Sequence, residues 1–276
     1  MPPRKKTPAK KATAKKKATK AVAVVEETPL ATAAAYEEMA GEGQENVTVD
    51  DVSIPFLGLV QSMSPQRKKN NAKYIDGAEE GDLFNTVTCE LFTAPVRVIP
   101  CFFKKQFIQW VPRDSGGGFR GAFSRTDDIV SQTPQNEKGV RVLDNGDELI
   151  ETATHYVLMW NDNTESWEPI VMSLSSTMLK MSRKWMTIIK NRKMKGGNGV
   201  FNPPSFAYEY SIGVATDSND KGEWYLFTVE SGKVQTDPEV AAQARHFHDL
   251  VNSGEVAEDH TKSQRGDEME PDSDNY

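Results

Sequence analysis

The stretch that decides the fold is residues 154–193, THYVLMWNDNTESWEPIVMSLSSTMLKMSRKWMTIIKNRK. It opens with two runs rich in β-branched and aromatic residues, THYVLMWN (154–161) and WEPIVMSLS (167–175). The polar residues 162–166 between them supply a turn. Two such runs around a short polar turn predict a β-hairpin.

A helix is predicted directly after this hairpin, over TMLKMSRKWMTIIKNRK (177–193). Ser175 or Ser176 can cap its start. Apolar residues recur at three- and four-residue steps, which gives the helix one apolar face. These residues are Met178, Met181, Trp185 and Ile188 or Ile189.

Further strands are expected on both sides of this unit. Upstream, TVTCELFT (86–93) and VRVIPCFFKKQFIQWV (96–111) predict two strands, with Pro95 near the turn and Pro100 at an edge or a bulge. Downstream, FAYEYSIGVAT (206–216) and EWYLFTVES (223–231) predict a second hairpin around SNDKG. Residues 112–147 are rich in Gly, Asp, Asn and Ser and are expected to form a long loop or insertion.

Two more helices are predicted at the borders of this region. VDDVSIPFLGLVQSMSP (49–65) suggests a short helix ended by Pro65. PEVAAQARHFHDLVNSG (238–254) predicts a final helix capped by Asp237, with Pro238 at its first position and its end near Gly254.

The order of these elements predicts a mainly β (α+β) fold. Strands, then a helix, then further strands are the order expected of an OB-like β-barrel with one internal helix. Another β-barrel or a sandwich would give the same periodicity. We expect a disordered basic arm and acidic linker over 1–46, one nucleic-acid-binding core over 47–254 and a disordered acidic tail over 255–276.

Charge is distributed unevenly along the 276 residues. The first 20 residues hold nine of the 33 basic residues and no acid, so the rest of the chain carries 24 basic against 40 acidic residues. The net charge of −7 therefore conceals a basic arm followed by an acidic chain. A lysine arm of this composition is expected to stay disordered and to bind any nucleic acid.

The predicted internal helix and the residues after it form the most distinctive basic segment. Between Thr177 and Val200 there are seven basic residues and no acid, which favours contact with a polyanion over an ordinary solvated face of mixed sign. The glycine-rich KMKGGNG (193–199) is expected to be a flexible extension that can approach a nucleic-acid backbone. The basic candidates are Lys180, Arg183, Lys184, Lys190, Arg192, Lys193 and Lys195.

A second patch mixes cations with aromatic rings. Such mixtures bind single strands, because cations follow the phosphates while exposed bases stack on the rings. Alternation in VIPCFFKKQFIQW puts Phe103, Lys105 and Phe107 on one face of the strand and Lys104 and Trp110 on the other. We expect some rings to be core and choose Phe107 and Trp110 as the exposed ones. The candidates of this patch are Lys104, Lys105, Phe107, Trp110, Arg113 and Arg120.

The C-terminal sequence DEMEPDSDNY has five acids, no base and an aromatic last residue. It resembles the tail of single-stranded DNA-binding proteins of bacteria and tailed phages, and IPFLGLVQSMSP, WVPRDSGGGFRG and MSRKW are similar to phage proteins of that kind. The resemblance implies an OB-fold, a role in phage DNA replication or recombination, and a tail that recruits a polymerase, helicase or primase and competes with DNA. The tail candidates are Asp267, Glu268, Glu270, Asp272, Asp274 and Tyr276.

Enzymatic motifs are weak in this sequence. His246 and His248 are two residues apart on a predicted helix and point to different sides, and there is no CxxC or HExxH. DSGGGFRG lacks the GK[ST] ending of a phosphate loop. We therefore expect no catalysis, metal or cofactor.

Cellular context follows from three features. Cys89 and Cys101 are expected to be buried free thiols in a reducing cytoplasm. No run of 18 apolar residues and no secretory signal is present, so the host cytoplasm without membrane attachment is expected.

Together these features predict a non-enzymatic protein that binds single-stranded DNA without sequence preference. The alternative is a structural or packaging protein whose lysine arm binds duplex DNA. The sequence leaves a homo-oligomer open.

Overall fold

The computed structural model describes residues 36–39, 42–43, 45–46, 54–137, 139–220 and 222–263. The expected basic arm and the acidic end of the tail, from residue 264 on, lie outside these residues. Twelve strands and three α-helices are described from residue 54 on. The strands outside the main sheet are β1 (Leu57–Leu59), β2 (Leu83–Asn85), β3 (Leu91–Phe92), β9 (Met194–Gly196) and β10 (Gly199–Phe201), and the helices are α2 (Asp128–Gln132), α3 (Leu179–Lys190) and α4 (Pro238–Ser253).

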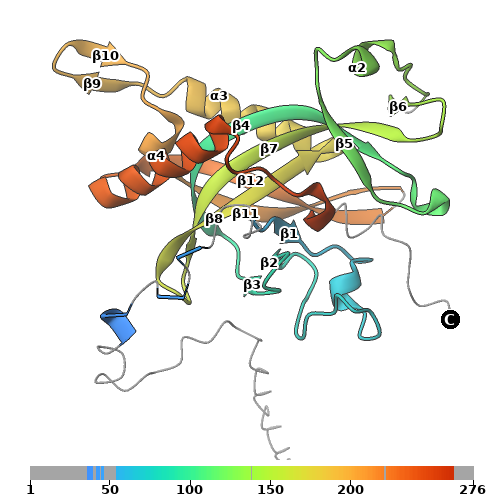
Figure 1. Ribbon diagram of the computed structural model, residues 1–276, viewed down its shortest axis with the longest axis horizontal. Helices are drawn as coiled ribbons and strands as arrows, with labels where there is room; N and C mark the ends of the chain where they lie inside the picture. Colours follow the sequence, from blue (N-terminus) through green and yellow to red (C-terminus); the bar gives the residue numbers. More distant parts are fainter. Residues whose placement is uncertain are drawn as a thin grey trace, which may run out of the picture.

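A seven-stranded antiparallel sheet forms the centre of the molecule (Figure 1). Its two long central strands, β4 (Val96–Trp110) and β7 (Glu148–Asn161), pair from Val98 to Trp110. On the far edge of β4 the first part pairs with β11 and the last part with β5, while β7 carries β8 and β6 on its far edge. The remaining bounds are β5 (Phe119–Ser124), β6 (Arg141–Val142), β8 (Ser166–Ser175), β11 (Tyr208–Asn219) and β12 (Gly222–Val234).

Both predicted hairpins are confirmed. β7 and β8 pair from Thr152 to Asn161 around the polar turn, and β11 pairs with β12 along its length. The prediction for Pro100 is also confirmed, because the register between β4 and β7 shifts between Pro100 and Phe102. A bulge suits this position since proline has no N–H to donate to the ladder.

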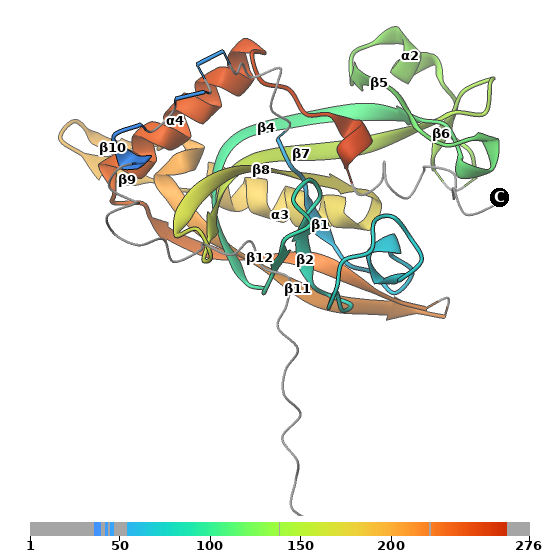
Figure 2. The ribbon, with the colours of Figure 1, turned by 60° about the horizontal axis from the view of Figure 1, so that its bottom comes forward.

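The bulge decides which side chains of β4 face which layer. Before it, Val98 lies in the core beneath α3, and after it Phe103 packs there. Cys101 and Phe102 both face the opposite side, where α4 lies. We call the side of the sheet toward α3 the inner face and the side toward α4 the outer face; Figure 2 shows α3 between the β4–β7–β8 layer and the β11–β12 layer.

Helix α3 supplies the centre of the inner core. Trp185 is completely buried, stacks on His155 of β7 at a ring-centroid distance of 4.6 Å and meets Tyr210 of β11 edge-on at 5.8 Å. Met181 is buried beside it, and Met178, Ile188 and Ile189 pack against the same cluster. The predicted apolar stripe is thus confirmed, although a single 3₁₀ turn (Ser176–Met178) precedes the α-helix.

Helix α4 covers the outer face, as Figure 1 shows. Ala244, Phe247 and Val251 are buried against Ile99, Tyr156 and Leu158 of the sheet in one cluster. The predicted ends are confirmed: the Asp237 side chain accepts a hydrogen bond of 2.9 Å from the Glu239 N–H, and Gly254 has a left-handed φ of +81°. Glycine adopts that conformation without steric cost, which ends the helix.

The sheet curls but does not close into a barrel within the described residues. Strand β1 lies across the gap: Phe56 bridges Val171 of β8, and the Gln61 amide exchanges two hydrogen bonds, of 3.0 and 2.9 Å, with the backbone of Tyr225 in β12. The mainly β prediction is confirmed in this form, while the OB-like barrel stays a prediction.

Several sequence expectations are wrong. Residues 57–59 are strand β1 and not part of a helix, because Leu57 and Leu59 are buried in a three-stranded sheet with β2 and β3. Cys89 is exposed at a φ of +58°, while Cys101 is buried as expected. Residues 112–147, expected to be a long loop or insertion, are not an irregular loop but an insertion between β4 and β7 that contains β5, α2 and β6.

The C-terminal border of the folded part also lies further along than expected. Glu258 has a side chain that is 4% exposed and His260 is 2% exposed, so residues 255–263 pack on the core instead of beginning a disordered tail. The polar composition concealed this, because Glu258 finds its partners Lys104 and Tyr156 only in the folded structure.

Burial of His155 makes the fold sensitive to acid. Burial lowers the pKa of His155 to about 3, below its usual 6.5, so the unfolded chain binds a proton in this interval that the folded chain does not. The contribution of neutral His155 to the free energy of unfolding should be complete above pH 6.5 and should decrease as the pH falls toward 3. The decrease should reach at most about 1.4 kcal/mol per pH unit. Urea unfolding of the wild type and His155→Gln between pH 7 and 4 measures it; an equal pH slope in both proteins contradicts the prediction.

Candidate nucleic-acid interface

The outward face of α3 carries unpaired positive charge. Because Met181 and Trp185 fix the opposite side of the helix in the core, Lys180, Arg183 and Lys190 project outward at three- to seven-residue steps. All three side chains are exposed, and within the described residues none has a side-chain hydrogen bond or ion pair. This part of the predicted basic site is an open cationic surface.

Three other predicted bases of this segment are held by the protein. Arg192 lies 4.6 Å from the ring of Tyr208 and donates hydrogen bonds to the Ser231 hydroxyl (2.8 Å) and the Gly232 carbonyl (2.9 Å). Lys184 lies 3.5 Å from the carbonyl of Val229, and Lys193 donates to Asn202. The contacts of Lys184 and Arg192 hold α3 and the residues after it against β12. Each of the three cations has fewer N–H donors left for a ligand.

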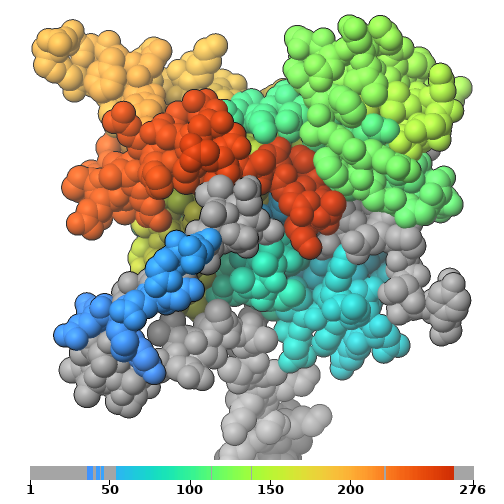
Figure 3. Space-filling model, viewed as in Figure 1, coloured from blue at the N-terminus to red at the C-terminus, as the bar shows by residue number. Residues whose placement is uncertain are grey.

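The predicted flexible extension is a β-hairpin. Strands β9 and β10 pair from Met194 to Phe201, and the hairpin projects from the body at the upper left of Figures 1 and 3. Lys195 is exposed on it, together with Val200 (69% exposed) and Phe201 (48% exposed). The sequence prediction missed this apolar pair, which stands beside the cations.

The second predicted patch divides between the two faces of β4. Lys105 and Phe107 are on the inner face, where Lys105 forms an ion pair of 2.7 Å with Glu151. Phe107 lies 5.9 Å from the guanidinium of Arg141. The predicted Arg120 is exposed on β5.

A groove of about 560 Å³ joins this inner patch to the start of α3. Its lining includes Phe107 of the second patch, the nearby Arg125 and Arg141, and Ser176 and Leu179 at the beginning of the helix. The groove thus connects Phe107 of the second patch with the start of α3, the helix that carries the predicted bases. Arg141 was not among the predicted residues, because it lies in the stretch that was interpreted as a loop.

Two predicted residues belong to the outer face and are engaged there. Trp110 is 2% exposed and packs edge-on against Phe119, so the prediction that it is an exposed stacking ring is wrong. Lys104 is on the same face and forms an ion pair of 3.4 Å with Glu258. Lys104 thus contacts the C-terminal segment, which the sequence did not indicate.

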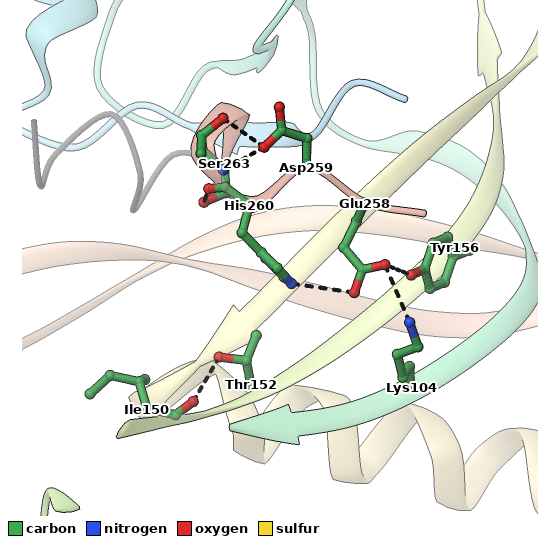
Figure 4. Close-up of polar contacts among 9 residues, drawn as sticks. Lys104, Ile150, Thr152, Tyr156, Glu258, Asp259, His260 and Ser263 are labelled. Carbon is green, nitrogen blue, oxygen red and sulfur yellow. Dashed lines mark hydrogen bonds and ion pairs between the residues drawn. The ribbon is translucent and has the colours of Figure 1, made fainter. Parts of the chain in front are cut away.

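Glu258 is the centre of a polar cluster on this outer face (Figure 4). It accepts a hydrogen bond from the Tyr156 hydroxyl, and its carboxylate lies 3.4 Å from Lys104 Nζ and 3.3 Å from His260 Nε2. Burial alone raises the pKa of Glu258, but the contacts of His260, Tyr156 and Lys104 outweigh it and lower the pKa to about 2. Glu258 is thus ionised and anchors residues 255–263 to the sheet.

The remaining predicted residues lie outside the described part of the chain. These are the Arg113 side chain and the tail residues Asp267, Glu268, Glu270, Asp272, Asp274 and Tyr276.

The described residues hold no group of three or more His, Cys, Asp or Glu side chains that could bind a metal ion. None of their helices has the length and apolar character needed to span a membrane.

Comparison with known proteins gives one match. A family model described as "Pam3 phage gp34-like protein" matches residues 19–257, which is most of the chain. No curated protein and no solved structure matches it.

The Glu258 cluster predicts a stability contribution from the C-terminal segment. Glu258→Ala leaves the buried Tyr156 hydroxyl without its partner and should lower the free energy of unfolding at pH 7 by about 1–3 kcal/mol. Since the folded pKa is about 2 and the usual value is 4.5, the difference from wild type should shrink as the pH falls from 4.5 toward 2. Urea titrations measure it, with the exposed Glu230→Ala as the control; equal losses in both variants contradict the prediction.

Proposed function

The chain belongs to the Pam3 phage gp34-like protein family, and from that premise we propose that it is a phage protein that binds single-stranded DNA without sequence preference. The proposal is for a binding protein and not an enzyme. The observation that carries it is the outward face of α3, where Lys180, Arg183 and Lys190 are exposed and unpaired within the described residues.

Charge supports contact with a polyanion. The stretch from Thr177 to Val200 has no acid in a chain of net charge −7, and it concentrates positive charge where α3 and the β9–β10 hairpin lie. Cations of this kind bind phosphates and release the counterions condensed on nucleic acid, which gives sequence-independent affinity. Lys195 extends this surface onto the projecting hairpin.

Rings beside the cations favour a single strand over a duplex. Phe201 is exposed on the hairpin, and Phe107 lines the groove at the other end of α3. Unpaired bases can stack on such rings at roughly 1–3 kcal/mol each, whereas the bases of a duplex are already stacked on one another. The proposed path of the strand runs from the groove along α3 to the hairpin.

Reversing two charges on α3 tests the proposal. Lys180→Glu with Arg183→Glu, in the full chain, should weaken binding to a fluorescent oligothymidylate at least about tenfold at low salt. The slope of log K against log salt should become shallower by about 1.4 if two phosphate contacts are lost. Fluorescence anisotropy over a salt series measures both quantities.

The matched control is Lys68→Glu with Lys69→Glu, which makes the same change in net charge at two exposed lysines away from α3. It should bind nearly as the wild type does. Equal weakening by both pairs would mean that only overall charge matters and would contradict an interface on α3. Tighter binding to duplex than to single strands by the wild type would favour the packaging alternative.

The acidic tail is proposed to compete with DNA and to bind replication proteins, on the strength of its sequence alone. Its five acids could occupy the α3 surface when DNA is absent. A chain that ends at residue 266 should then bind single strands more tightly than the full chain, with the largest difference at low salt, where charge screening is weakest. Unchanged or weaker binding in the same anisotropy assay would contradict competition.

A further inference from the structure

A second cavity, of about 230 Å³, lies where the curled sheet stays open. Its lining combines Phe56 and Leu57 at the start of β1, Phe227 of β12, the end of β8 and the C-terminal residues His260 and Ser263. Roughly 30 Å³ is the share of one water molecule in the liquid, so the space exceeds what a single buried water fills. It approaches the smaller ligand pockets, which begin at roughly 300 Å³.

Two buried side chains on this cavity have unsatisfied hydrogen-bonding groups. His260 is 2% exposed, and its Nδ1 has no partner among the described residues. The indole N–H of Trp110, also 2% exposed, has none either. A buried polar group without a partner costs roughly 1–3 kcal/mol, so a ligand that supplies partners is favoured here.

Hydroxyl groups surround these two side chains. Ser173, Ser175, Ser176 and Thr177 line the cavity without a side-chain hydrogen bond to another described residue, and Thr152 donates to the Ile150 carbonyl but can still accept. Figure 4 draws His260 together with Thr152, and both residues line the cavity. The cavity thus offers donors and acceptors together, beside aromatic walls.

Charge argues against an anionic ligand. Among the described residues no lysine or arginine lines the cavity, and the nearby Glu258, 3.3 Å from His260, is an anion already paired with Lys104. A phosphate or a carboxylate would find no lysine or arginine among the described lining residues to balance its own charge. The lining therefore favours a neutral ligand that carries both donors and acceptors.

Backbone strain and position connect the cavity with α3. Ser176 has a φ of +52°, a left-handed conformation that is unfavourable for serine and tends to occur at ligand sites. The same residue lines the groove that contains Phe107 and Arg125. The cavity therefore opens beside the start of α3, next to the proposed path of the strand.

We propose that this cavity binds a single unpaired nucleobase. The base would lie among Phe56, Trp110 and Phe227, with its edge hydrogen-bonded to His260 and the hydroxyls of the β8–α3 junction. The inference rests on the proposed function for the source of the base, but the cavity can be tested apart from strand binding.

Titration of the full chain with free deoxynucleosides tests the site directly. Thymidine, deoxycytidine and deoxyadenosine are titrated separately and followed by calorimetry or ligand-observed NMR. At least one should bind, with a dissociation constant on the order of 0.1–1 mM. Deoxyribose 5-phosphate, which has no base, should not bind.

His260→Phe keeps an aromatic ring but removes both ring nitrogens, and should weaken nucleoside binding at least tenfold. His246→Phe makes the same substitution at an exposed position on α4 and should leave the binding unchanged. If His260→Phe fails to fold, Ser173→Leu, which adds volume at the cavity wall, serves in its place.

The outcomes separate the two proposals. Nucleoside binding that depends on His260 supports the cavity even if the wild type binds no strand, in which case the proposed function fails alone. Absence of nucleoside binding, equal binding by His260→Phe, or equal binding of deoxyribose 5-phosphate overturns the cavity and leaves strand binding on α3 unaffected. If water alone fills the cavity, none of the nucleosides will bind.

Discussion

The indole of Trp185 is the contact on which the rest of the arrangement depends. It is completely buried between His155 of β7 and Tyr210 of β11, so it fixes α3 inside the curve of the sheet. A helix whose apolar face is buried in the core presents its opposite face to solvent. The exposure of Lys180 and Arg183 is therefore a consequence of core packing.

The bulge at Pro100 is the second constraint, because it sets the alternation of the longest strand. After it, odd-numbered residues face α3 and even-numbered residues face α4. Lys104 and Lys105 are neighbours in the sequence, yet one is bound to Glu258 of the C-terminal segment and the other lies near the α3 groove beside Glu151. One basic patch in the sequence thus becomes two separate environments.

The opening between β8 and β12 gives the molecule its second feature of interest. Strand β1 and the C-terminal residues 255–263 lie across this opening and bring Phe56, Trp110 and His260 to one cavity. The hydroxyl-rich end of β8 leads directly into α3, so the cavity and the cationic helix share the junction at Ser176. A surface that binds phosphates and a pocket that binds a base would then lie next to each other at this junction.

The sequence by itself determined the elements whose signals are local. The two hairpins, the period of α3, both ends of α4 and the bulge at Pro100 follow from apolar spacing, caps and the missing proline N–H. Only the tertiary structure decided what covers each face. Trp110 is buried against Phe119, and residues 255–263 are packed because Glu258 meets Lys104, 154 positions earlier in the chain, a contact that leaves no periodic trace in either segment.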